Sequence, residues 1–230
     1  MKNTKVKQKL TQDEINPVTF DLHEYNVHVG TREIFLHGYL DIEAYEQEEP
    51  GVEYRMATRF IKNLVLVQQQ GDENILIHQH TIGGNWNDGI AIYDAIKACP
   101  CLTTILAYAH ARSMSSITLQ AADRRVLMPN AEVVIHLGWI VLSDRNRAVY
   151  SQADYAKKTD ATMLRIYAHR CKHGKFFKGK MTPKEITAYI DGQLKAKTDW
   201  IMTAEEAVFY GFADGVFGAR GFETMEKIRR

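Results

Sequence analysis

The sequence predicts an α/β domain in which helices cover a mainly parallel sheet. Short apolar segments rich in β-branched residues alternate with longer segments of helical spacing, and turn residues separate them. Because strands that alternate with helices are joined by crossovers, we expect their pairing to be parallel. The expected inner strands are 74–78, 102–108, 126–128 and 133–136, and the expected helices are 53–67, 88–99 and 151–172.

Each expected helix has its own signal. Pro100 ends the helix at 88–99, because proline cannot continue a helical hydrogen-bond ladder. An acidic segment at 43–51 is expected to be an exposed loop before the first long helix. The apolar residues of the other two helices recur at helical spacing: Met56, Phe60, Ile61, Leu64 and Val67 in the first, and Tyr155, Met163, Ile166 and Tyr167 in the last.

Composition limits the classes of protein to which the chain can belong. With 230 residues, 45% of them hydrophobic, it can bury the core of one globular domain. A net charge of +1 provides no basic field for nucleic acid, and no apolar run is long enough to span a membrane. The three cysteines, Cys99, Cys101 and Cys171, are too few for a disulfide framework and favour a cytoplasmic location.

The chain is expected to consist of one domain with short extensions. Residues 1–19 are polar and lysine-rich at their start, lack the apolar core of a secretory signal, and are expected to be mobile. Residues 20–218 form the domain, and residues 219–230 form a C-terminal tail.

The most informative residue is Ser113, which lies between the strand at 102–108 and a helical segment at 114–122. A serine at this junction exposes its hydroxyl at the edge of the sheet, near the positive end of a helix dipole. This position suits a nucleophile, because backbone N–H groups nearby stabilise the oxyanion that its attack creates. Capping the helix is the commoner role of a serine at such a place.

Two further residues could complete a catalytic set with Ser113. His136 ends the strand at 133–136, where one ring nitrogen could accept the serine proton. Thr203 and Glu206 have capping-box spacing, which puts Asp199 on the loop before that helix. The alternatives are a partly buried histidine without a catalytic role and an aspartate that faces water.

The sequence resembles the proteolytic subunits of the Clp protease family of serine peptidases. The resemblance extends from about residue 20 to residue 217 and depends on the order of five segments rather than on any one of them. These are an apolar opening strand at 20–38, Gly83-Gly84 with the helix at 89–94, the small residues and serine at 111–114, the turn and strand at 129–136, and the closing helix, glycine turn and strand at 204–216.

The resemblance implies a fold and a role for each site residue. The fold would be the Clp-type, crotonase-like one, with repeated strand–turn–helix units and a protruding helical handle. Ser113 would be the nucleophile, His136 the general base and Asp199 the orienting acid. The backbone N–H groups of Gly84 and Met114 would form the oxyanion hole, and substrate would bind along Gly83, Leu137, Gly138 and Trp139. No metal or other cofactor is implied.

The resemblance also implies partners. Members form ring oligomers, commonly two stacked heptamers, with the active sites inside a chamber, and an AAA+ ATPase unfoldase feeds them unfolded polypeptides. A glycine loop with the lysine needed to bind nucleotide is absent from the sequence, so ATP use would belong to the unfoldase. Neither a nucleic acid nor a membrane is an expected partner.

The chain departs from the family pattern at three places. Ile82 replaces the usual proline before the two glycines, and Arg112 replaces a small residue before the serine. We expect Arg112 to pair with a nearby acid; contact with a side chain or carboxylate of the substrate is the alternative. The glycine-rich strand after the histidine is altered, and extra length in the basic stretch at 169–180 makes 137–180 an altered handle region.

Several other functions remain open at the level of sequence. The chain could be an inactive structural subunit, a crotonase-like acyl-CoA enzyme, or a peptidase that uses Lys195 or Lys197 as its base. The His78/His80 and His169/Cys171/His173 patterns lack the remaining ligands of a zinc site. In the basic stretch, Phe176 and Phe177 are expected to be tucked onto the core rather than to bind RNA.

Overall fold

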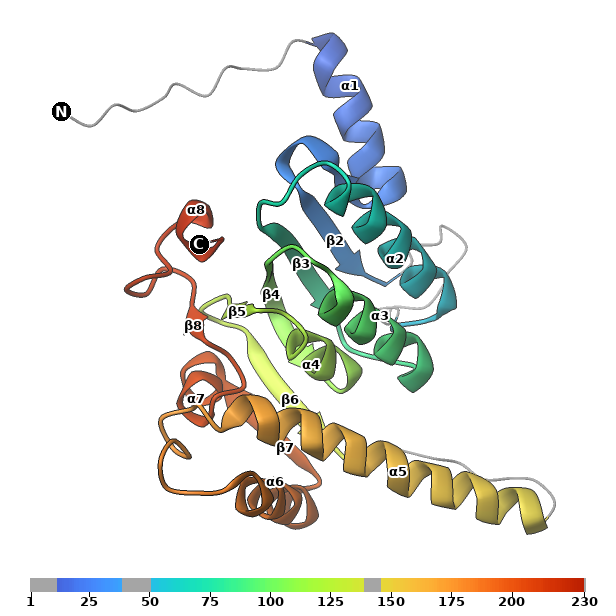
Figure 1. Cartoon of the computed structure of the whole chain (residues 1–230), viewed down its shortest axis with the longest axis vertical. Coiled ribbons are helices and arrows are strands. Elements are labelled where there is room, and N and C mark those ends of the chain that lie inside the picture. The colour runs from blue at the N-terminus through green and yellow to red at the C-terminus, as the bar shows by residue number, and fades with distance from the viewer. Residues whose placement is uncertain (1–11, 39–50, 139–145, 230) are drawn as a thin grey trace.

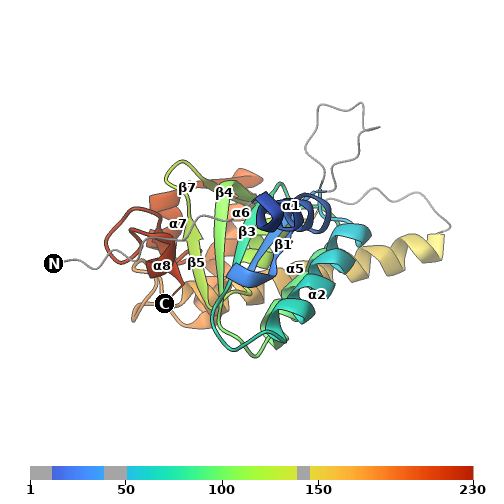
Figure 2. The ribbon, with the colours of Figure 1, turned by 90° about the horizontal axis from the view of Figure 1, so that it is seen from above.

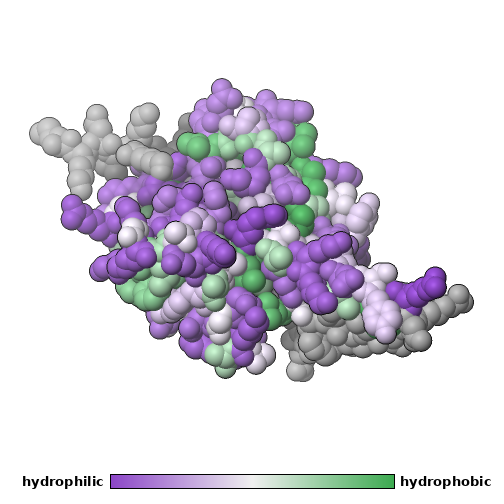
Figure 3. Space-filling model, turned by 60° about the horizontal axis from the view of Figure 1, so that its bottom comes forward, coloured by the Kyte–Doolittle hydropathy of each residue, from purple (hydrophilic) through white to green (hydrophobic). Residues whose placement is uncertain are grey.

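The computed structural model describes residues 12–38, 51–138 and 146–229 (Figure 1). Apart from Gly51, the acidic loop expected at 43–51 lies outside these residues. None of the helices in the described ranges combines the length and apolar character needed to cross a bilayer. The face drawn in Figure 3 is largely hydrophilic, with hydrophobic residues showing in small areas, in line with a mean hydropathy of −0.31.

Eight strands of the described chain form one sheet in the order β1-β2-β3-β4-β5-β8, with β6 and β7 branching from β4. Figure 2 shows β5, β4, β3 and β1 following one another across the molecule. All pairs between β2 and β8 along this path are parallel, which confirms the predicted fold class. The strands are β1 (Val27–His28), β2 (Glu33–His37), β3 (Ile75–Thr81), β4 (Thr103–Arg112), β5 (Arg124–Leu127), β6 (Glu132–His136), β7 (Asp199–Thr203) and β8 (Gly215–Val216).

Strand β4 is longer than predicted, and its extra length positions the site. Its first half pairs with β5, and its last three residues, from His110 to Arg112, pair in parallel with β6. Strand β7 then pairs antiparallel with β6. The end of β4 and the strand that carries His136 are therefore hydrogen-bonded neighbours.

Helices cover one face of the sheet. The helices α2 (Tyr54–Gln68), α3 (Trp86–Ala98) and α4 (Met114–Leu119) join the main core with inward residues of the strands such as Ile77 and Ile105. Side chains on a strand alternate between the two faces. Leu76 and Leu106 accordingly face the opposite side, where Ile228 of the short α8 (Met225–Ile228) packs on them.

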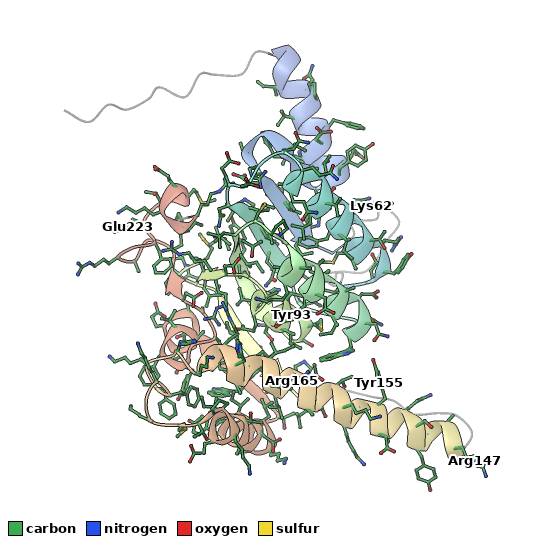
Figure 4. The ribbon with its side chains drawn as sticks, viewed as in Figure 1. Lys62, Tyr93, Arg147, Tyr155, Arg165 and Glu223 are labelled. Carbon is green, nitrogen blue, oxygen red and sulfur yellow. The ribbon has the colours of Figure 1, made fainter. Side chains whose placement is uncertain are left out.

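Helix α5 (Asn146–Cys171) is the protruding handle that the fold class implied. Its 26 residues span about 39 Å. Figures 1 and 4 show its outer half extending away from the body, with Arg147 at the far end. Of the apolar residues that recur at helical spacing, Met163 and Tyr167 in its inner half are buried, whereas Tyr155 is half exposed.

An aromatic cluster fixes the last part of the chain. Phe177 is fully buried, and Phe176 packs on Phe177, Tyr189 and Tyr210. This confirms that the two phenylalanines of the basic stretch are tucked onto the core. The cluster joins the segment after α5 to the helices α6 (Pro183–Lys197) and α7 (Ala204–Tyr210), and α7 begins with the predicted capping box.

The opening of the domain differs from the prediction. Instead of an opening strand from residue 20, the structure has α1 (Gln12–Phe20) followed by a π-helical turn, Asp21–Tyr25. The strands begin only at Val27, and β1 and β2 form a short antiparallel pair. The left-handed conformation of Asn26 (φ 59°) turns the chain from helix into strand.

Candidate active site

Ser113 lies on a sharp, strained turn between β4 and α4. Its backbone has φ 49° and ψ −125°, a conformation that a residue with a Cβ rarely adopts. The turn is held in place because the Ser113 N–H donates to the Val134 carbonyl at 2.9 Å. The buried Ser115 hydroxyl also accepts from the Arg112 N–H at 2.8 Å and donates to the Arg112 carbonyl at 2.7 Å. Such a partly exposed, strained serine between a strand and a helix is the arrangement called a nucleophile elbow.

The glycine pair lies directly against this turn. The Gly83 carbonyl accepts the N–H of Val52 at 2.6 Å, and the Val52 carbonyl accepts the N–H of Asn85 at 2.9 Å. In a parallel bridge, the residue between two such partners directs its own N–H and C=O to the opposite side. The Gly84 N–H therefore points away from Val52, and Gly84 is exposed where it lines the pocket.

His136 and Asp199 are brought together by strand pairing. They lie directly opposite one another in the antiparallel β6–β7 register. Asp199 is the first residue of β7, so the prediction that it lies on a loop is wrong. The His136 Nδ1 lies 2.7 Å from the Leu137 carbonyl. Because a carbonyl only accepts, this contact puts the proton on Nδ1 and leaves Nε2 as the acceptor. Within the described chain, no hydrogen bond joins the Asp199 carboxylate to the imidazole.

A pocket of about 480 Å³ lies between the serine turn and α5, a volume within the range of ligand sites. Both Ser113 and His136 line it. The described residues that line it are Gly84, Asn85, Trp86, Ser113, Met114, Ile117, His136, Gly138, Gln152, Tyr155, Ala156, Thr159, Asp160 and Met163.

The remaining predicted site residues have different outcomes. Gly138 lines the pocket, and Leu137 contributes its carbonyl to His136. Trp139 lies outside the described residues. Arg112 pairs with Glu132 at 2.8 Å, which confirms the expected pairing with a nearby acid.

The alternative of a lysine base loses support from side-chain placement. Lys195 pairs with Asp191 at 2.6 Å, and Lys197 lies over the Trp200 ring. Neither lysine lines the pocket, so neither is placed to activate Ser113. The described residues contain no group of three histidine, cysteine or acidic side chains placed to hold a metal.

Sequence reasoning missed the pocket wall that α5 provides. Tyr155, Asp160 and Met163 all line the pocket, and the Tyr155 hydroxyl donates to the Asn87 side chain at 3.0 Å. Figure 4 shows Tyr155 extending from the middle of α5 toward the body. These residues share one helical face, but spacing alone does not say which element that face will meet.

A serine at a strained strand-to-helix turn, with a histidine on the same pocket, defines the class of serine hydrolases. The Clp protease family model matches residues 47–220, more than half of the chain, and the chain therefore belongs to this family of serine-type endopeptidases. The chain is similar to the ATP-dependent Clp protease proteolytic subunit of Deinococcus radiodurans, with 28% identity over 72% of this chain and 76% of the relative.

Two further relatives show similar identity. The ATP-dependent Clp protease proteolytic subunit of Streptococcus gordonii is 29% identical over 72% of this chain and 80% of its own. The ATP-dependent Clp protease proteolytic subunit 3 of Streptomyces coelicolor is 30% identical over 66% of this chain and 65% of its own.

Replacing Gly83 with alanine should lower kcat/KM for a peptide by at least about a hundredfold. The Gly83 backbone has φ +97°, and an added Cβ would lie 2.6 Å from the Arg112 carbonyl and 2.7 Å from the Met114 nitrogen. The turn or the glycine loop must then shift, and a misplaced oxyanion donor costs about 2.7–4 kcal/mol. Gly179→Ala is the matched control, because φ there is +72° but nothing lies within 4 Å. An equal decrease of kcat/KM in both variants would contradict the interpretation that the contact between Gly83 and the serine turn is needed for activity.

Proposed function

We propose that the protein cleaves peptide bonds of unfolded polypeptides through an acyl-enzyme on Ser113. The Ser113 hydroxyl attacks the carbonyl, and the His136 Nε2 takes its proton and later passes it to the leaving amine. The observation that carries the proposal is that the strained serine turn and His136 line one pocket. The peptide amine leaves first, and water then hydrolyses the acyl ester.

The oxyanion hole in this proposal consists of two backbone N–H groups. Gly84 directs its N–H away from Val52, and Met114 is the first residue of α4, whose opening N–H groups have no acceptor within the helix. Both residues line the pocket beside Ser113. Paired donors of this kind stabilise the tetrahedral oxyanion more than the ground-state carbonyl.

Asp199 is proposed to hold the imidazolium. It lies directly opposite His136 in the strand register, and directly opposite residues of an antiparallel pair carry their side chains on the same face of the sheet. In the present conformation the Leu137 carbonyl occupies Nδ1 and maintains the same tautomer. The proposed active conformation exchanges the Leu137 carbonyl for the Asp199 carboxylate, which stabilises the charged imidazolium better than a neutral acceptor does.

We further propose the assembly that family membership suggests. Copies of the domain at 20–218 form a heptameric ring or two stacked rings with the pocket facing a chamber, and an AAA+ ATPase delivers substrate. Residues 1–19 would be a mobile segment and residues 219–230 a tail. Cys99, Cys101 and Cys171 are all free thiols, which supports a reducing, cytoplasmic location.

An inactive structural subunit of such a ring is the second candidate. The observation that favours it is the absence, among the described contacts, of a bond between Asp199 and His136. A subunit of this kind would keep the fold and the ring contacts without an activated serine.

Labelling with a fluorophosphonate tests the proposed function. We expect a single adduct on Ser113, located by mass spectrometry, because such reagents phosphonylate only activated serines, whose oxygen bonds to phosphorus as fluoride leaves. Ser151→Ala, on the exposed face of α5, is the control and should label like the unmodified protein. An intact protein in which Ser113 stays unlabelled would instead support the structural subunit.

A further inference from the structure

The wall that α5 contributes to the pocket carries a single formal charge. Ala156, Asp160 and Met163 recur at spacings of four and three residues, so they share one helical face. Among the described residues that line the pocket, Asp160 is the only aspartate, glutamate, lysine or arginine. The neighbouring walls formed by Met114 and Ile117 are apolar.

The Asp160 carboxylate is positioned by the backbone beside the histidine. Its Oδ1 accepts the N–H of Gly138 at 3.2 Å. A carboxylate can accept further hydrogen bonds, so Oδ2 remains able to receive a donor from a ligand. In the part of the chain that the structure describes, no lysine or arginine pairs with Asp160, whereas Asp154 on the same helix pairs with Lys157 at 3.4 Å.

We infer that this pocket binds a lysine or arginine side chain on the acyl side of the scissile bond, with Asp160 as its charge partner. The aliphatic stem would lie along Met114 and Met163, and the ammonium or guanidinium would reach the carboxylate. A neutral apolar side chain would leave the charge of Asp160 without a partner, and a glutamate would be repelled by it. The inference deepens the proposed function and rests on it.

Peptides that differ only in the residue on the acyl side test the inference. With arginine, lysine, leucine or glutamate at that position, we expect kcat/KM to be at least about tenfold higher for the basic peptides than for the glutamate peptide. In Asp160→Asn, the ratio of kcat/KM for arginine over leucine should fall at least tenfold. Asparagine keeps an oxygen for the Gly138 N–H, so the change isolates the charge. Asp154→Asn is the matched control on the exposed part of α5.

The possible contrary results have distinct meanings. If Asp160→Asn lowers cleavage of all four peptides equally, the residue only supports the backbone at Gly138, and the inference is wrong. If the leucine peptide is preferred by both proteins while Ser113 labels with fluorophosphonate, the inference is wrong and the proposed function stands. If Ser113 neither labels nor turns over any peptide, the proposed function fails and the inference fails with it.

Discussion

Asp199→Asn is expected to lower kcat for peptide cleavage by about ten-thousandfold while leaving the fold intact. An asparagine amide can donate to the imidazole and stabilise the wrong tautomer, and it provides no negative charge for the imidazolium. Asp199 is exposed at the start of β7, so the substitution removes no core packing. Steady-state kinetics on a peptide, with circular dichroism of the same samples, measures both effects.

Asp191→Asn is the control for this prediction. Asp191 is a partly exposed acid on α6 and pairs with the exposed Lys195 away from the pocket. Its loss should change kcat by less than about threefold, because exposed ion pairs contribute little. If Asp199→Asn lowers kcat by less than tenfold, the Leu137 carbonyl alone maintains the histidine tautomer during turnover.

The sequence predicted the parallel sheet and the junction at Ser113 because both depend on local patterns. Apolar β-branched runs, and the change in the spacing of hydrophobic residues from that of a strand to that of a helix, are visible within ten residues. The position of Asp199 was harder to predict. The capping box at Thr203 was confirmed, but the strand before that helix exists only because β6 offers a partner edge, which is a nonlocal condition.

Other parts of the site could not be read from the sequence for a related reason. The positive φ of Ser113 is imposed by bonds from Val134 and Ser115 rather than by the serine itself. The role of Asp160 depends on where a 26-residue helix leaves the body. At the N-terminus, the hydrophobic residues of 12–25 do not recur at a clear helical or strand spacing. The structure has helix there, where a strand was expected from residue 20.

Removing the charge of Asp214 is expected to have the largest effect on stability. Arg125 is 3% exposed, and its guanidinium donates to Asp214, to the Gln120 side chain at 2.6 Å and to the Gly211 carbonyl at 2.8 Å. Asp214→Asn leaves this buried cation without its counter-ion. Loss of one partner of a fully buried pair costs about 3–5 kcal/mol of unfolding free energy, and because the Asp214 side chain is 33% exposed we expect a cost at the lower end of that range. Urea denaturation at fixed protein concentration measures it.

Glu132→Gln is the matched control, because it breaks an arginine–carboxylate pair whose side chains are 46% and 44% exposed. Its cost should stay below about 1 kcal/mol. Equal costs for the two substitutions would mean that the Arg125 pair is solvated in solution.

The same pair makes stability depend on pH in a defined direction. Burial raises the pKa of Asp214, whereas the hydrogen bonds and the charge of Arg125 lower it. The lowering effect is the larger one, so the pKa of Asp214 lies below its ordinary value of 3.8. A carboxyl whose pKa is lower in the folded state stabilises the fold above its unfolded pKa and loses that contribution as pH falls through the folded value. The stability of the unmodified protein should therefore fall as pH drops below about 4, and Asp214→Asn should lack this part of the acid sensitivity.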